Sequence, residues 1–383
     1  MRCANGLRGA SVAARFAAVA AAAAVYSLCH GVAWAEEPDY GNLGGPVKLV
    51  VGYQPYGTEN LDSIVVREKE LWKKYLPAGS SVEMEIALQG SIIVNNMLAG
   101  KQQIGYMGDM PSIISTTKEK VADVRIVAVN SIDPMCQYLM VRTDTPDFKT
   151  RKKAFKWLNG KTLAAPKGSC ADRFMNVILA KENIKPEAYL NQGNEVMISN
   201  FRAKRLDAAV TWEPYVGKLV ADGLAKIVIN GEPYGENNVT FIVMRGDLIK
   251  KRPDVVKAWL NAHLDAQLFL SDPKNEKEIV EMFVKANPGL SPKVFWSTLY
   301  GTYPMEATRS KARLTFAFTF TPQVMEVITK DVAFLRSIKA VDVDKLRSDA
   351  VMPQFTEEIL KERGLKSPVG VVYALPKPSW DMN

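Results

Sequence analysis

Histidine is almost absent from this chain of 383 residues, which contains only His30 and His263. Hydrolases with a serine or cysteine nucleophile need a histidine base beside it, and histidine-rich metal centres need several imidazoles. We therefore expect no catalytic residues, no metal site and no cofactor. His263 lies in an amphipathic stretch, where a surface or core position is more common than a catalytic one.

Long hydrophobic runs are also lacking. The longest small and apolar run covers residues 16–28, and its thirteen residues fall short of the roughly 20 that a membrane-spanning helix needs. Arg2, Arg8 and Arg15 precede it, and Ala33-Trp34-Ala35 follows it. This layout is typical of a cleavable secretory signal peptide. We expect residues 1–35 to be removed and the mature protein to be exported.

Dense positive charge is a third absence. The leader holds three of the 49 lysines and arginines and none of the 41 acidic residues, so the mature chain carries a net charge of +5. The excess is scattered, whereas a nucleic-acid groove requires basic clustering interleaved with aromatic residues. We expect no nucleic-acid partner; the mildly positive field favours a small anion.

Cysteine is scarce as well. Of the four cysteines, only Cys136 and Cys170 remain after processing. An exported pair can form a disulfide, but the bond also requires Cα atoms within about 7 Å. The sequence leaves open whether these two are bridged or free.

What the mature chain does contain is a regular alternation of short apolar runs with helix-length amphipathic stretches, which indicates an α/β fold. Predicted strands cover residues 47–54, 82–88, 104–108, 124–130, 137–142, 162–165, 195–198, 208–212, 226–229 and 239–245. Predicted helices cover residues 61–75, 91–99, 111–120, 169–181, 201–204 and 214–221. After Asp247 we expect no strands, only helices over residues 253–270, 276–285, 322–338 and 355–363, and a surface tail from Ser367.

Two lobes follow from this organisation. The length suggests two domains, no flexible linker separates the two α/β sets, and strands near 137–142 and 239–245 are placed to cross between them. We predict mostly parallel sheets, with lobe 1 formed by residues 36–142 plus 240–383 and lobe 2 by residues 143–239, around a cleft that can hinge. Residues 96–108 faintly repeat in residues 200–212, either by duplication or because helix–turn–strand units are common.

The loops after the predicted strands are the candidate ligand contacts, because ligands of open α/β sheets sit beyond the carboxyl ends of the strands. Three of these loops, at 89–91, 109–112 and 168–170, combine glycine, serine or proline at the start of a helix. A helix N-terminus presents unpaired N–H groups and a partial positive charge, so these loops can cradle a sulfonate, nitrate or carboxylate. Plain helix capping is the alternative, since Ser169 and Asp172 also make a capping-box pattern.

Three further side chains near these loops have two interpretations each. Trp212 closes an apolar strand and can either wall a pocket or belong to the core. Asp109 and Glu213 can cap a helix, form salt bridges or hold the ammonium group of a ligand. If both acids face the cleft, a zwitterion such as an amino-sulfonate fits better than nitrate.

At this point the chain resembles the periplasmic substrate-binding proteins of ABC importers for nitrate, sulfonates and taurine. The resemblance rests on residues 97–112, 167–169 and 206–215, and the segment Asp-Ala-Ala-Val-Thr-Trp-Glu-Pro is its most specific part. It implies a type II periplasmic binding fold, with two α/β lobes joined by crossing strands around a ligand cleft and a helical C-terminal part. The ligand contacts that it implies are Tyr53, Gln54, Tyr56, Gln89, Gly90, Ser91, Gly108, Asp109, Met110, Gly168, Ser169, Cys170, Trp212 and Glu213.

The resemblance implies a periplasmic monomer that captures a small organic anion or zwitterion and delivers it to the permease and ATPase subunits of an importer in the inner membrane. Nitrate, bicarbonate, carboxylates and pyrimidine precursors are alternative ligands. An enzyme on the same scaffold and a sensor are further alternatives. A metal-ion receptor is another, and would use the tyrosines at 53, 56, 106 and 215.

Overall fold

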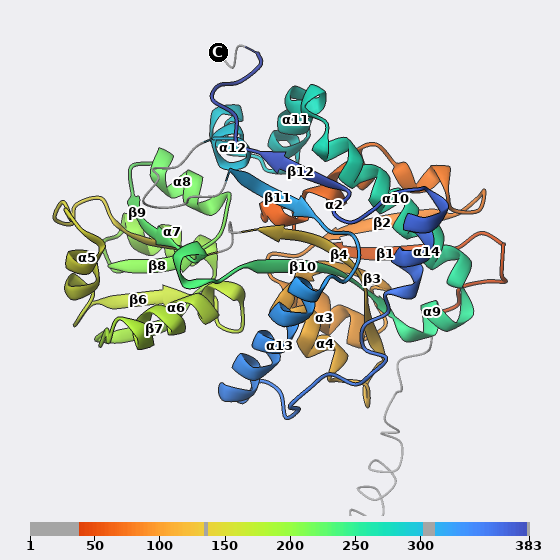
Figure 1. Ribbon diagram of the computed structural model, residues 1–383, viewed down its shortest axis with the longest axis horizontal. Coiled ribbons are helices and arrows are strands. Elements are labelled where there is room, and N and C mark those ends of the chain that lie inside the picture. The colour runs from red at the N-terminus through yellow and green to blue at the C-terminus, as the bar shows by residue number, and fades with distance from the viewer. Residues whose placement is uncertain (1–37, 134–136, 302–310, 381–383) are drawn as a thin grey trace, which may run out of the picture. The chain divides into compact units, whose positions relative to one another are not determined.

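The computed structural model describes residues 38–133, 137–301 and 311–380 (Figure 1). The predicted signal peptide, residues 1–35, and Cys136 lie outside these described residues. The chain from Asp39 onward is built on two β-sheets, each with helices packed on it. This is the predicted α/β organisation.

The larger sheet has seven strands and is mixed, whereas we predicted a mostly parallel one. Parallel pairing is confined to β1 with β2 and β3, while β10 runs antiparallel to both β3 and β4. Because β10 enters from the other sheet, it runs against its neighbours. In spatial order the strands are β12 (Gly370–Tyr373), β11 (Ala312–Phe316), β4 (Val124–Asp133), β10 (Asn238–Arg245), β3 (Ile104–Gly108), β1 (Lys48–Tyr53) and β2 (Ser81–Ile86).

The smaller sheet has five strands, of which β6 pairs in parallel with β7 and β8 while β5 is antiparallel to β8 and β9. Their order is β7 (Ala188–Asn191), β6 (Thr162–Ala165), β8 (Ala208–Thr211), β5 (Tyr138–Arg142) and β9 (Ala225–Asn230). We call the parts around the two sheets the large lobe and the small lobe. The predicted lobe boundaries stay a prediction; β5, which they assign to lobe 1, pairs within the small-lobe sheet.

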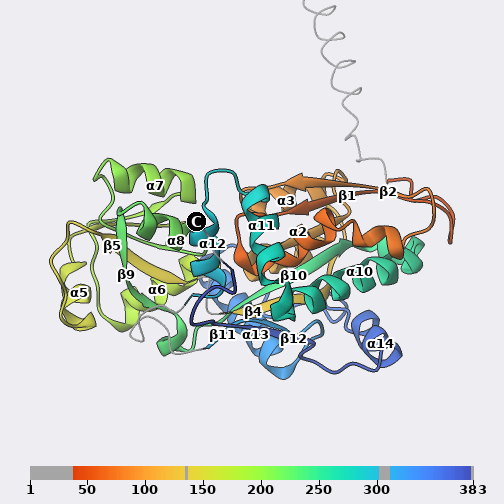
Figure 2. The same ribbon diagram turned by 90° about the horizontal axis from the view of Figure 1, so that it is seen from above.

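Helices connect most of the strands (Figures 1 and 2). Those of the small lobe are α5 (Arg151–Trp157), α6 (Cys170–Lys181), α7 (Asn194–Arg202) and α8 (Tyr215–Ala221). The others are α2 (Leu61–Glu68), α3 (Gly90–Leu98), α4 (Asp109–Thr116), α9 (Gly246–Lys251), α10 (Pro253–Ser271), α11 (Glu276–Ala286), α12 (Pro292–Leu299), α13 (Pro322–Ser337) and α14 (Gln354–Glu362). Short 3₁₀ turns cover Thr58–Asn60, Leu71–Lys74, Glu232–Tyr234 and Pro273–Asn275.

Strand β10 separates two hydrophobic clusters because its side chains alternate between the two faces of the sheet. Val239, Phe241 and Val243 pack with residues of α3, α4 and α13, which Figure 1 draws below β10. Ile242 and Met244 pack on the other side, in the cluster that includes α2 and α10. The sheet is therefore covered on both faces, and α3 and α4 sit together on one of them.

Two predicted features of secondary structure are wrong. Residues 195–198 belong to α7 rather than to a strand, because Met197, Ile198 and Phe201 are buried at helical spacing while Val196 is 51% exposed. The strand of that region is β7, which precedes α7. Strands also do not stop at Asp247: β11 and β12 pair at the edge of the large sheet, where nearby proline and glycine are tolerated.

The faint internal repeat corresponds to a local motif. Helices α3 and α7 both end in a residue with positive φ, Gly100 (76°) and Lys204 (58°), whose N–H bonds back to the helix before the next strand begins. Asn183 and Gly223 end α6 and α8 in the same way, with φ of 53° and 65°. Four helices share this C-cap, so the shared turn is a common local motif and does not by itself require duplication.

His263 is a core histidine, one of the two ordinary positions that the sequence suggested. It is fully buried on α10, with Nδ1 3.5 Å from an oxygen of Asp62 and Nε2 2.9 Å from the amide of Gln267. Burial lowers the pKa of His263 to about 3 and raises the pKa of Asp62 to about 8. The two groups are therefore both neutral near pH 7.

This neutral pair predicts how stability depends on pH. Asp62 ionises at a pKa near 3.8 when unfolded and about 8 when folded, so the wild-type protein loses stability as pH rises between these values. Asp62→Asn mimics the protonated acid and lacks this titration, while His263 titrates equally in both proteins. In urea unfolding, we expect the free energy of unfolding of the variant to rise relative to that of the wild type by about 1 kcal/mol per pH unit from pH 5 to pH 8. A constant difference would show that Asp62 is ionised in the folded protein.

Candidate functional site

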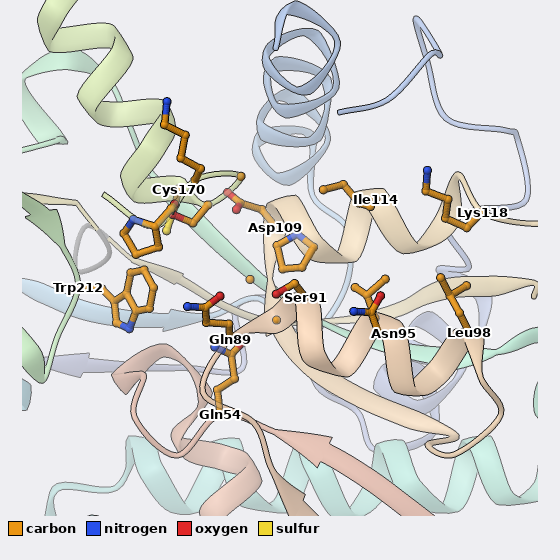
Figure 3. A pocket seen from close by; sticks show the side chains of 18 residues that line it. Gln54, Gln89, Ser91, Asn95, Leu98, Asp109, Ile114, Lys118, Cys170 and Trp212 are labelled. Atoms are coloured by element: carbon orange, nitrogen blue, oxygen red, sulfur yellow. The ribbon is translucent and has the colours of Figure 1, made fainter. Parts of the chain in front are cut away.

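A cavity of about 260 Å³ lies between the large and small lobes, where the predicted loops meet (Figure 3). Helices α3 and α4 of the large lobe form one wall, and the loop before α6 and the end of β8 form the other. The predicted site residues that line the cavity are Gln54, Gln89, Gly90, Ser91, Gly108, Asp109, Gly168, Ser169, Cys170 and Trp212.

Four predicted site residues are not brought into this lining. Tyr53 alternates with Gln54 at the end of β1, so its ring points into the core, where Arg67 donates to its hydroxyl. Met110 is fully buried in the cluster behind α4. Tyr56 packs near the ring of Tyr215, with centroids 6.5 Å apart.

Glu213 is the fourth. Its carboxylate is fully buried and accepts hydrogen bonds from the Gly217 N–H at 2.9 Å and from the Thr298 hydroxyl at 3.1 Å. Burial raises the pKa of Glu213 to about 7. The side chain thus joins α8 to α12 instead of facing the cavity. Its backbone carbonyl accepts from the Thr58 N–H at 3.2 Å, which connects the loops after β1 and β8 across the cleft.

The sequence analysis missed the part of the cavity that runs along the helices. Most of the side chains concerned lie on one stripe of α3 and on one stripe of α4 that continues to Lys118, and two lie in the loop before α6. A spacing of three, four and seven residues from Ser91, and of three and seven residues from Pro111, was the available signal. The additional lining residues are Val94, Asn95, Leu98, Pro111, Ile114, Lys118, Pro166 and Lys167.

Glycine is required at one of these helix starts for packing. A Cβ at Gly90 would lie 2.4 Å from Cγ of Pro111, so the glycine lets α3 begin directly against the start of α4. A Cβ at Gly108 would meet no atom within 4 Å, and its φ of −63° suits any residue. The fold therefore does not require glycine at position 108, but the missing side chain leaves space in the cavity.

The start of α6 is capped as the sequence pattern suggested. The Ser169 hydroxyl accepts from the Asp172 N–H, and the Asp172 carboxylate accepts from the Gly168 N–H at 2.9 Å. The first-turn N–H groups of a helix have no acceptor within the helix itself. Capping and anion binding are thus compatible at this terminus.

Behind the cavity lies a buried ion cluster centred on Arg173 of α6. Its guanidinium pairs with Asp331 of α13, with Glu236 at 2.8 Å and with Asp109 at 3.7 Å. Burial raises the pKa of Asp109, and the Arg173 charge opposes that rise. The cluster ties the small lobe to the large lobe and holds Asp109, whose second carboxylate oxygen accepts no hydrogen bond from the described residues.

Cys170 begins α6 at the cavity and is disulfide-bonded. The partner that the sequence offers, Cys136, lies outside the described residues. Because its sulfur is in a disulfide, Cys170 is not a thiolate nucleophile.

The tyrosines considered for metal binding have other partners. The Tyr106 hydroxyl accepts from Trp259 at 3.0 Å, the Tyr215 hydroxyl donates to Glu195 at 2.6 Å, and that of Tyr53 bonds to Arg67. Within the described residues, no group of three or more acidic, cysteine or histidine side chains has the geometry of a metal site.

The same part of the chain contains no helix long and apolar enough to cross a bilayer.

Trp212 lines the cavity while its ring packs edge-on to Tyr215, with centroids 6.3 Å apart. We expect Trp212→Ala to weaken binding of the cavity's ligand about 10- to 100-fold in titration calorimetry, because buried aromatic anchors contribute about 2 kcal/mol or more. The control is Trp157→Ala, which removes an indole packed on Phe148 in the small lobe outside the cavity. Equal affinities of the two variants would place Trp212 in the core alone.

Known proteins agree with this architecture. The taurine-binding periplasmic protein of Escherichia coli (strain K12) is 26% identical over 247 residues, covering 58% of this chain and 74% of that protein. The alkanesulfonate-binding protein SsuA of Xanthomonas axonopodis pv. citri, solved with MOPS, shares the fold with a TM-score of 0.65 at 19% identity, covering 80% of this chain and 98% of SsuA. Further structures of this fold include sulfonate- and nitrate-binding periplasmic proteins and a ligand-binding component of an ABC-type import system.

The fold also occurs in an enzyme. The desulfurization enzyme DSZB aligns with a TM-score of 0.60 at 14% identity, covering 82% of this chain and 99% of the enzyme. The curated relatives, in contrast, are named as binding proteins. Residues 44–284, most of the chain, match the NMT1-like family, and the protein therefore belongs to that family, whose fold it shares with periplasmic binding proteins for sulfonate, taurine and nitrate.

Proposed function

We propose that this protein is the periplasmic solute-binding component of an ABC importer and captures a small organic anion or zwitterion, such as a sulfonate or taurine, between its lobes. The observation that supports this most is the convergence of the starts of α3, α4 and α6 on one cavity. The starts of α3 and α6 contribute first-turn N–H groups, and all three helices bring a positive end to the cavity, which favours a negatively charged group. At α4 the Met110 N–H donates to the Asp109 carboxylate at 2.7 Å and Pro111 has no N–H, so this helix contributes mainly through its dipole.

Asp109 supports a zwitterion within this class. It is the one acidic side chain in the cavity lining, it is fully buried, and one of its oxygens accepts no hydrogen bond from the described residues. That oxygen, Oδ2, lies 3.7 Å from the Arg173 guanidinium, so a ligand ammonium group would share the Asp109 carboxylate with Arg173 while the sulfonate is directed toward the helix starts.

The size of the cavity favours an organic ligand over nitrate or bicarbonate. Its volume of about 260 Å³ approaches the lower end of the range for drug-sized ligands, about 300 Å³. Small carboxylates and pyrimidine precursors are the alternative ligands of comparable size. Catalysis is not part of the proposal, because the cavity cysteine is in a disulfide and the buried His263 packs against the Asp62 and Gln267 side chains in the core.

The proposal also includes the cellular setting. The signal-peptide pattern of residues 1–35 would direct the chain to the periplasm, where it acts as a monomer and passes its ligand to permease and ATPase subunits. Two contacts across the cleft support a closed, ligand-holding arrangement. One is the Thr58–Glu213 hydrogen bond. The other is the approach of the Gln89 side-chain amide to Gly193, where an added Cβ would lie 2.8 Å from the amide nitrogen.

A thermal-shift screen of residues 36–383 tests the proposal, using taurine, alkanesulfonates, nitrate, bicarbonate, small carboxylates, amines and pyrimidines. A ligand at 100 times its Kd stabilises the folded state by about 2.7 kcal/mol, enough to raise the melting temperature by several degrees. We expect shifts with taurine and alkanesulfonates. Shifts with amines or pyrimidines alone would contradict the anion site.

A further inference from the structure

One end of the cavity has a chemistry different from the helix starts. Figure 3 shows Trp212 and Cys170 at one end and Leu98 and Lys118 at the other, with Ile114 on the way. The walls between are α3 and α4, which touch where they begin, at Gly90 and Pro111. The cavity is therefore elongated along these two helices.

The middle of this path is mainly apolar, with the Asn95 amide as its polar side chain (Figure 3). Val94 and Leu98 follow Ser91 on one stripe of α3, and Ile114 follows Pro111 on the facing stripe of α4. Leu98 and Ile114 are only partly buried, so apolar surface is left for a ligand to cover. Ser91 and Leu98 are about 10 Å apart along the helix at 1.5 Å per residue. A two-carbon sulfonate held at the helix starts would leave this surface bare.

A lysine side chain lies at the end of the cavity farthest from Trp212 (Figure 3). Lys118 is exposed, lies two residues beyond the end of α4 and lines the cavity, and it forms no ion pair with an acid of the described residues. Many other surface lysines, such as Lys257 and Lys285, do pair with a glutamate. Lys118 is thus available to a second anionic group.

We infer that the groove between α3 and α4 is a second subsite, and that the ligand is a bifunctional acid: one anionic group at the helix starts, an apolar spacer of about 10 Å along Val94, Leu98 and Ile114, and a terminal carboxylate or sulfonate at Lys118. This inference rests on the proposed function, since it assumes that the helix starts hold the first anionic group. It adds the length and the second charge of the ligand.

Titration calorimetry with three probes tests the inference: ethanesulfonate, octanesulfonate, and octanesulfonate carrying a terminal carboxylate. We expect octanesulfonate to bind at least about tenfold more tightly than ethanesulfonate, because each methylene buried is worth about fourfold. The terminal carboxylate should add about two- to fivefold at low salt, an amount typical of an exposed ion pair, and lose it at high salt.

Two variants with matched controls locate the subsite. Leu98→Gln should weaken binding of octanesulfonate and leave ethanesulfonate unchanged, whereas Ile92→Gln, at a 42% exposed position of the same helix outside the cavity, should alter neither. Lys118→Met should remove the gain from the terminal carboxylate, whereas Lys101→Met, at an exposed lysine outside the cavity, should retain it.

The possible outcomes are distinct. If ethanesulfonate and octanesulfonate bind equally well, the groove is not a subsite and only the inference is overturned. If chain length matters but Leu98→Gln and Lys118→Met behave as their controls do, the tail lies elsewhere and the inference is again overturned. If none of the three probes binds, the inference is overturned, and if taurine also fails to bind, the proposed function itself is wrong.

Discussion

Arg173→Met should destabilise the protein by about 3–5 kcal/mol at pH 7. The substitution removes the cation and leaves Asp109, Asp331 and Glu236 facing one another in a buried site, and an uncompensated buried charge costs this much. Because burial raises the pKa of Asp109, this carboxyl should take up a proton as the pH falls, and the deficit relative to the wild type should shrink toward pH 4. Urea unfolding at several pH values measures both effects.

Two further variants separate the cluster from a general effect of losing an arginine. Arg202→Met removes a 62% exposed guanidinium 3.6 Å from Asp222 and should cost less than about 1 kcal/mol. Asp331→Asn combined with Arg173→Met should recover part of the stability, since it removes one of the unpaired charges. If Arg173→Met costs no more than Arg202→Met, the cluster does not hold the lobes together.

Gly108→Val should reduce taurine affinity about 5- to 150-fold while leaving the melting temperature of the ligand-free protein within a few degrees of the wild type. The valine methyl groups would project into open cavity space from a backbone that already has φ −63° and ψ 173°. Forcing extra atoms into an occupied site costs about 1–3 kcal/mol. Gly108→Ala, which adds less volume, should lie between the wild type and the valine variant.

Gly108 is a better test position than Gly168. A Cβ at Gly168 would also meet open space, but its φ is +73°, a conformation that strains any side chain. A loss of binding in a Gly168 variant would therefore mix steric filling with a distorted loop. If the Gly108→Val protein is unfolded, or if it binds taurine as tightly as the wild type does, the assignment of Gly108 to the cavity at the start of α4 is wrong.

The sequence was most informative where local chemistry decides the structure. The loops after β1, β3 and β8 and the starts of α3 and α6 were placed at one site because strands of an α/β sheet end on the same side. The cap at Ser169 also depends on neighbours close in sequence, whereas the sequence left open whether His263 is in the core or on the surface.

The other features of the site depend on contacts between residues that are far apart in the sequence. Whether Glu213 faces the cavity depends on Thr298 of α12, and the role of Arg173 depends on Asp331 of α13, both far away along the chain. Side chains alternate between the two faces of β1, so a shift of one residue in its register decides whether Tyr53 faces the core or the cavity. The sequence did not determine this register to within one residue. Lys118 belongs to the cavity only because α4 lies beside α3.

The most direct test of the central claim is a calorimetric titration of taurine into the mature protein and into Gly108→Val. The account predicts binding with a Kd on the order of micromolar, about 8 kcal/mol, in the wild type, and strongly reduced binding in a variant that melts at nearly the same temperature. Equal binding by both proteins, or binding of an amine and not of any sulfonate, would contradict an anion held at the helix starts.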